Sequence, residues 1–152
     1  MTILVGVDPG KVTGVAVWWD PEVYDCSNHL KSGLDVAEVS SSTQVPAVIR
    51  RMLDGRRPDL ILVERCRQNP RKTNQPEAVE VTGAVRSLAD DLVVRCVYQS
   101  PSPAKKMVTT ALLRRLGLWH PSADGHQNAA TAHLLLGMAT FMPVRFARLT
   151  GI

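Results

Sequence analysis

Three side chains in this sequence belong to the types that bind metals or move protons, and each stands beside a structural signal. Asp8 follows the apolar run TILVGV and precedes a Pro-Gly turn. Glu64 ends the apolar run LILV, and His126 begins a run of helix-forming residues. Two carboxylates can hold Mg²⁺, which takes a few acidic oxygen ligands plus water. Such ions activate water for attack on a phosphodiester, so the chemistry indicated is metal-assisted hydrolysis.

Each of these residues also has a structural explanation. An aspartate before Pro-Gly often caps its turn, and Glu64 could pair with Arg65 or Arg67, because an ionised carboxylate is costly to bury alone. Asp124 precedes the helical run and is favoured as its N-cap, with metal ligation as the weaker alternative. His133 lies on an apolar stretch, and we interpret it as a packing residue. The two acids, each at a strand end, together favour a functional site.

The elements that would position these residues follow from hydrophobic periodicity. Strands are predicted for residues 2–8 and 13–20 as a hairpin, for 59–64 and 92–99, and less clearly for 30–40. Helices are predicted for residues 43–55, 76–92, 102–118 (with Ser102 as cap and Pro103 in first position) and 125–142, with 143–152 as a tail. The order predicts an α/β fold in which a mixed sheet carries helices on its faces, in a single domain over residues 1–152.

The charge of the sequence bears on the kind of partner it could bind. The net charge is +4, and residues 64–115 hold ten Lys or Arg against five acids, which is compatible with a polyanionic partner such as nucleic acid and equally with a plain solvated basic face. The apolar runs are too short to span a bilayer, and no charged segment precedes an apolar one at the N-terminus, so we expect a cytoplasmic protein without membrane contact. The three cysteines are odd in number and widely spaced, which favours reduced thiols over disulfides or a zinc site.

Four segments together resemble the RuvC family of Holliday-junction resolvases, particularly its short phage-encoded relatives. The segments are ILVGVDPGKVTGVAVW, LILVE, PSPAKKMVT and DGHQNAATAHLL, which follow the family's order across nearly the whole chain. The resemblance implies a ribonuclease-H-like fold, with a mixed five-stranded sheet flanked by helices on both faces. It also implies a Mg²⁺-dependent endonuclease, with Mn²⁺ as a substitute, that cuts branched DNA (four-way junctions, forks or flaps) as a homodimer in a bacterial or phage-infected cell.

The resemblance assigns roles to individual residues. Asp8 and Glu64 match the catalytic, metal-binding acids of the first strand and the later central strand. His126 matches the acid or histidine that opens the final helix, whereas Ala129 stands where the family carries a catalytic aspartate. Lys105 is a candidate for stabilising charge at the scissile phosphate. Lys105 and Lys106 match a region where the family uses lysines on the DNA backbone, and the charge of a loop-like stretch adds Arg65, Arg67, Arg71 and Lys72 as DNA-binding candidates.

Ala129 leaves the activity of this chain open. Alanine cannot bind a metal, although position 129 shares a helical stripe with His126 and His133. Three alternatives follow: Asp124 or His126 with water serves as ligand, the chain binds branched DNA without cutting it, or an aspartate has been replaced by alanine. A ribonuclease-H-like enzyme acting on RNA is a further alternative, against which the glutamate ending LILVE argues.

Two helical segments are candidates for the homodimer contact. The end of the last helix, residues 134–141, is apolar nearly all round, for which core packing is the ordinary explanation. The helix over residues 76–92 carries Gly83 and Ala84 among valines. Tryptophans could stack on unpaired bases, but Trp18 and Trp19 point to opposite faces of one strand, so at least one belongs to the core.

Overall fold

A five-stranded mixed sheet forms the centre of the computed structural model, which describes residues 1–20, 33–66, 75–121 and 124–152. The strands are β1 (Thr2–Asp8), β2 (Thr13–Asp20), β3 (Gly33–Val39), β4 (Leu60–Glu64) and β5 (Arg95–Gln99), in the order β3-β2-β1-β4-β5. Strand β2 is antiparallel to both of its neighbours, whereas β1, β4 and β5 run parallel. Both the hairpin start and the third strand predicted from the sequence are confirmed.

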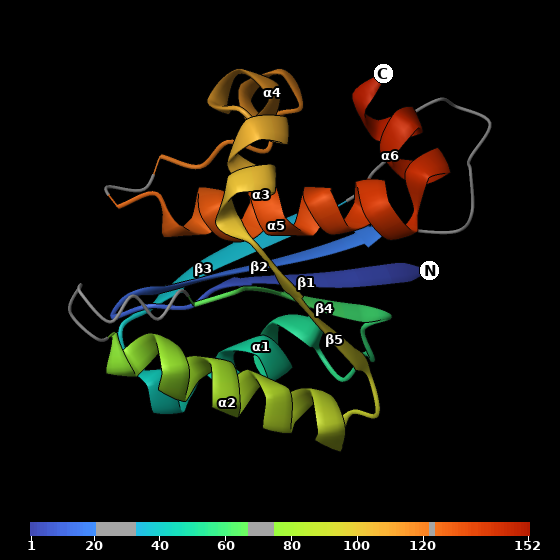
Figure 1. Ribbon diagram of the computed structural model, residues 1–152. Helices are drawn as coiled ribbons and strands as arrows, with labels where there is room; N and C mark the ends of the chain where they lie inside the picture. Colours follow the sequence, from blue (N-terminus) through green and yellow to red (C-terminus); the bar gives the residue numbers. More distant parts are fainter. Residues whose placement is uncertain (21–32, 67–74, 122–123) are drawn as a thin grey trace.

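Helices cover both faces of the sheet (Figure 1). One face carries α1 (Val45–Leu53), reached through the short 3₁₀ helix η1 (Ser42–Gln44), and α2 (Pro76–Asp91). On the other side lie α3 (Pro101–Met107), α4 (Thr110–Arg115), α5 (His126–Phe141) and α6 (Pro143–Thr150). The predicted mixed sheet with helices on both faces is therefore the observed architecture. Among the helices of the described residues, none has the length and apolar character needed to cross a membrane.

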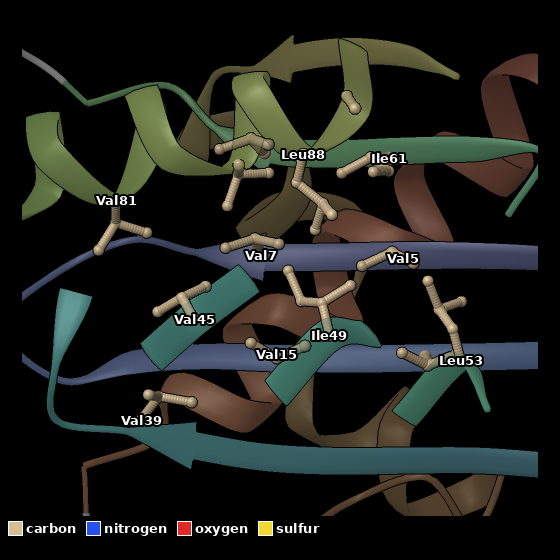
Figure 2. Packing of buried hydrophobic residues seen from close by; sticks show 14 of the residues in the cluster. Val5, Val7, Val15, Val39, Val45, Ile49, Leu53, Ile61, Val81 and Leu88 are labelled. Atoms are coloured by element: carbon tan, nitrogen blue, oxygen red, sulfur yellow. The ribbon is translucent and has the colours of Figure 1, made fainter. Parts of the chain in front are cut away.

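Strand alternation divides the core into two halves. Val5, Val7 and their neighbours point toward α1 and α2, where Ile49 and Leu88 pack against them (Figure 2). Leu4 and the residues in step with it face α5. Because the side-chain period of a strand is two, the side chains at the carboxyl ends of β1 and β4 also fall on the α5 face.

The two adjacent tryptophans follow this division. Trp18 is buried in the half-core beneath α5, whereas Trp19 packs against the half-core beneath α1 and α2. The prediction that they point to opposite faces is confirmed.

Two glycines allow α5 to lie directly on the sheet. A Cβ atom at Gly14 would stand 2.0 Å from the carbonyl oxygen of His126, and one at Gly6 would stand 2.2 Å from that of Ala130. No side chain fits at such distances, so the helix backbone rests on the backbone of β1 and β2. This contact fixes the first turn of α5 beside the end of β1.

The predicted helix over residues 102–118 is wrong, because the chain forms two shorter helices there. Val108 and Thr109 leave the helical conformation between α3 and α4. The side chain of Thr109 then accepts a hydrogen bond from the backbone N–H of Leu112 at 3.1 Å. A threonine that caps a new helix satisfies a free backbone donor, which stabilises the break.

Two further boundaries differ from the prediction. Helix α3 begins at Pro101 with Ser100 at its N-cap position, two residues before the predicted Ser102 and Pro103. The predicted tail is largely helical, since α6 occupies Pro143–Thr150. In both helices a proline occupies the first turn, where its missing N–H is not needed.

Candidate functional site

The carboxyl ends of β1 and β4 bring the two predicted acids together. The strands are parallel, and Val7 is in register with Val63, so Asp8 and Glu64 occupy neighbouring positions on the α5 face. Both line a pocket of about 780 Å³. Its lining comprises Asp8, Pro9, Gly10, Lys11, Val12, Glu64, Gln75, Glu77, Lys105, Asp124, Gly125, His126 and Ala129.

His126 contacts the first of these acids. Its Nδ1 lies 2.8 Å from Oδ2 of Asp8, and its side chain keeps 32 % of its surface exposed. Burial raises the pKa of the Asp8 carboxyl above its ordinary value of 3.8. The hydrogen bond from His126 acts against that rise in pKa, while the charge of Glu64 adds to it. Two acids close enough to repel each other favour a bound cation.

His133 contacts the second acid from inside the protein. Its Nε2 lies 2.7 Å from Oε2 of Glu64, and only 2 % of its side-chain surface is exposed. His133 is therefore buried and hydrogen-bonded, as predicted, but its partner is a carboxylate of the pocket. Glu64 pairs with this histidine, which differs from the ion pair with an arginine considered from the sequence.

Gln99, on β5, contacts the other ring nitrogen of His133, the one that faces away from Glu64. The side-chain amide lies 2.9 Å from Nδ1 of His133. With the amide nitrogen on that side, it donates to Nδ1 and to the His133 carbonyl oxygen, also at 2.9 Å, while the amide oxygen accepts from the Gly137 N–H at 3.2 Å. In this orientation of the Gln99 amide, each donor faces an acceptor. The opposite orientation would place the amide oxygen against the His133 carbonyl oxygen.

The other site residues predicted from the sequence lie in the same pocket. Lys105 reaches it from α3, and Ala129 forms part of the wall formed by α5. Asp124 also lines the pocket, but its predicted role as N-cap is wrong. Gly125 occupies the cap position with φ of 74°, a left-handed conformation that glycine adopts without strain.

The predicted DNA-binding residues do not form one group around the pocket. Lys106 is exposed but does not line the pocket, although the adjacent lysine does. Arg65 is also exposed, and its backbone N–H donates to the Gln99 carbonyl oxygen at 2.7 Å. Arg67, Arg71 and Lys72 lie outside the described residues.

Sequence reasoning missed several residues of this region. Lys11 lines the pocket. Its position directly after the Pro-Gly turn that follows Asp8 was a signal that was not used. Gln75 and Glu77, at the start of α2, line it from a segment distant in the sequence. The spacing of seven residues between His126 and His133 placed both on one helical stripe, which was the signal for the second histidine.

The donor set fits a hard divalent cation. Asp8 and Glu64 offer carboxylate oxygens from two rigid strand ends, and water completes the shell of Mg²⁺ in many proteins. Across the described ranges, no three His, Cys, Asp or Glu side chains are arranged as a ready metal cluster.

Cys66 and Cys96 are free thiols, as predicted, and Cys26 lies outside the described residues.

Comparison with known proteins identifies the fold. No protein-family model matches the sequence, and no curated protein matches it. Among solved structures, Thermus thermophilus RuvC in complex with a Holliday junction substrate matches with a TM-score of 0.66 and 19 % identity, over 93 % of this chain and 97 % of that one. Another Thermus thermophilus RuvC structure gives 0.65 and 20 %, over 99 % and 97 %.

A viral enzyme has the same architecture. The Fowlpox virus resolvase, in a complex with Holliday junction DNA, matches with a TM-score of 0.55 and 13 % identity, over 91 % of this chain and 99 % of that one. The match covers nearly the full length of each protein. The chain therefore has the fold of the RuvC-type Holliday-junction resolvases.

Proposed function

We propose that this protein is a divalent-metal-dependent endonuclease that acts on branched DNA. One observation carries the proposal: Asp8 and Glu64 line the same pocket as Lys11 and Lys105. Carboxylates hold a cation, and lysines hold the phosphate on which that cation acts. A pocket with both kinds of charge suits hydrolysis of a phosphodiester.

The residues of the pocket take distinct roles in this proposal. Asp8 and Glu64 hold the cation, which when bound supplies a Lewis acid for the phosphate and for the attacking water. Lys105 stabilises the negative charge that grows on the phosphate. When Nδ1–H of His126 donates to Asp8, Nε2 is left as an acceptor that can orient water or take its proton.

The experiment is Mg²⁺-dependent nicking of a synthetic four-way junction. Asp8→Asn and Glu64→Gln are expected to lower the rate by roughly 10³-fold, as the loss of a preorganised electrostatic group does, while junction binding persists. Retained cleavage in either variant would overturn the assignment of these acids.

A neighbouring pair of lysines supplies a matched control. Lys105 lines the pocket and Lys106 does not, although both are exposed on α3. Lys105→Ala is expected to lower the cleavage rate by roughly 10²-fold, whereas Lys106→Ala should weaken only the salt-dependent binding of DNA. Equal effects on rate would argue against a role for Lys105 at the phosphate.

The branched substrate is proposed from the fold and from charge. Two of the solved structures that match the chain are complexes with Holliday junction DNA, and this chain carries a net charge of +4. Affinity for a four-way junction should exceed affinity for a duplex of the same sequence, and both should fall steeply with salt. A flat salt response would contradict a DNA-binding role.

A second candidate function is a junction-binding module without catalysis. Ala129 favours it, because this residue lines the pocket without offering a ligand. Ala129→Asp separates the two candidates in the same nicking assay. Wild-type cleavage supports the enzyme, and cleavage that appears only with Ala129→Asp supports a binding module on a competent scaffold.

The proposal includes a homodimer, since two symmetric cuts of a four-way junction require two active sites. Helix α2 offers a face for it, because Val79 is 47 % exposed and a Cβ atom at Gly83 would meet nothing within 4 Å. The measurement is light scattering across a range of concentrations. Val79→Glu should shift the mass toward the monomer, and a wild-type monomer at all concentrations would overturn this part.

A further inference from the structure

A buried hydrogen-bonded network supports the second carboxylate of the pocket. As whole residues, His133 is 1 % exposed and Gln99 is 8 % exposed. Neither residue lines the pocket that Glu64 lines. The network joins three elements, since the residues lie on α5, β5 and β4. We infer that His133 is a positioning residue, which fixes the Glu64 carboxylate in the orientation that binds the cation, with Gln99 holding its ring.

The hydrogen bonds determine which ring nitrogen carries the proton. Gln99 donates its amide N–H to Nδ1 of His133, so Nδ1 acts as an acceptor. The proton therefore resides on Nε2, which donates to Oε2 of Glu64 over 2.7 Å. One carboxylate oxygen is thereby held from the protein side, and the carboxylate can rotate only by breaking this bond.

The backbone makes the arrangement rigid. Glu64 and Gln99 are paired in register on adjacent parallel strands. The backbone N–H of Arg65 donates to the Gln99 carbonyl oxygen at 2.7 Å, and the Gln99 amide also contacts the backbone of α5 at His133 and Gly137. Each side chain of the network is thus fixed by groups on a neighbouring element.

A neutral donor suits this task better than a cationic one. An arginine or lysine beside Glu64 would offset its charge and compete with a bound cation. A histidine that donates one N–H orients the carboxylate and leaves its negative charge for the metal, as outer hydrogen-bond partners of metal ligands do elsewhere. This role rests on the proposed metal-dependent function, but the network itself does not.

The first test examines the network without metal or DNA. Nitrogen-15 NMR of labelled histidine distinguishes the two neutral tautomers. For His133 we expect the Nε2–H form in the wild type, and also in Gln99→Leu, because the Glu64 carboxylate still accepts from Nε2. A wild-type His133 in the Nδ1–H form would overturn the inference.

The second test measures Mn²⁺ binding by electron paramagnetic resonance of the free ion, without DNA. In His133→Gln the amide nitrogen can reach the position of Nε2, whereas in His133→Asn the shorter side chain can reach only the position of Nδ1. The asparagine variant is expected to lose about 10-fold to 100-fold in Mn²⁺ affinity, and the glutamine variant should stay close to wild type. Circular dichroism and melting curves establish that both variants are folded.

The outcomes separate this inference from the function on which it rests. Equal Mn²⁺ affinity in the asparagine and wild-type proteins would overturn the positioning role, whether or not the protein cuts DNA. A wild type with the Nε2–H tautomer that binds no Mn²⁺ would overturn the role together with the metal-dependent function. A wild type that binds Mn²⁺ but does not cut, with the expected difference between the variants, would support the positioning role and contradict only the nuclease.

Discussion

The two acids of the pocket each pair with a histidine, and the two pairs have similar hydrogen bonds and opposite surroundings. Asp8 pairs with His126 at 2.8 Å and Glu64 pairs with His133 at 2.7 Å. The side chain of His126 is 32 % exposed and lines the pocket, while that of His133 is 2 % exposed and lies behind it. An exposed histidine can exchange its partner for water or substrate, whereas a buried one cannot without leaving a polar group unsatisfied. The same kind of pair therefore leaves His126 able to contact water or substrate, whereas His133 stays bound to Glu64 behind the pocket.

The largest difference between the pairs should appear in stability. His133→Leu leaves Glu64 and Gln99 without their buried partner, which is expected to lower the free energy of unfolding by about 3 kcal/mol. His126→Leu removes a partly exposed pair and should cost less than about 1 kcal/mol. Urea denaturation of both variants in chelator measures the two values, and equal losses would remove the distinction drawn above.

A substitution beneath α5 should break one pair and spare the other. Gly14→Ala places a Cβ atom against the His126 carbonyl oxygen, so the first turn of the helix must move away from β2 and Asp8. We expect a cost of about 1–3 kcal/mol in unfolding free energy, with loss of the Asp8–His126 hydrogen bond but retention of the His133 tautomer by NMR.

Gly83→Ala is the control for this substitution. A Cβ atom at Gly83 meets nothing within 4 Å, and alanine favours a helix interior over glycine by about 1 kcal/mol. The control should therefore stabilise the protein. A Gly14→Ala variant that gains stability in the same way would contradict the close packing of α5 on the sheet.

The smallest effect concerns the charge of Asp8. Because its pKa is raised above 3.8, the folded state binds a proton there more readily than the unfolded state does, and ionisation costs stability. This cost is absent below pH 3.8 and grows as the pH rises through the folded-state pKa. Asp8→Asn should therefore be more stable than wild type at neutral pH in chelator, and the advantage should shrink toward acid pH.

Metal should reverse that ranking. Wild type is expected to gain thermal stability with Mn²⁺, because binding to the folded state stabilises it, whereas Asp8→Asn should gain little. Asp91→Asn removes only an exposed ion pair with Arg50, and as the control its response to Mn²⁺ should follow that of wild type. A wild type that stays more stable than Asp8→Asn in chelator at neutral pH would count against the burial of charge at this position.

The sequence predicted those parts of the site that local patterns mark. Asp8 and Glu64 each end an apolar strand, so their type and position were sufficient to find them. His126 received its role through the resemblance, as the histidine that opens the final helix. The sheet with helices on both faces followed from the same runs of apolar residues, since strands of this kind need cover on each side.

The missed parts depend on contacts between distant segments. Gln99 ends the edge strand β5 and meets His133 only because β5 pairs with β4 and α5 crosses above them. In the sequence Lys11 resembles an ordinary turn residue, and only the folded chain shows that it lines the pocket. The break before α4 depends on one threonine cap, which competes with a helical pattern that otherwise continues through it.

Helix α5 carries its two histidines seven residues apart, about 10 Å along the axis, and Ala129 lies between them. Neither acid–histidine hydrogen bond involves Ala129, so these two contacts do not require a particular side chain there. From an alanine codon that ends in a pyrimidine, a single nucleotide change gives an aspartate codon, and every aspartate codon can return to alanine in the same way. A lineage with this scaffold can therefore gain or lose a metal ligand in one mutational step while inheriting the fold unchanged.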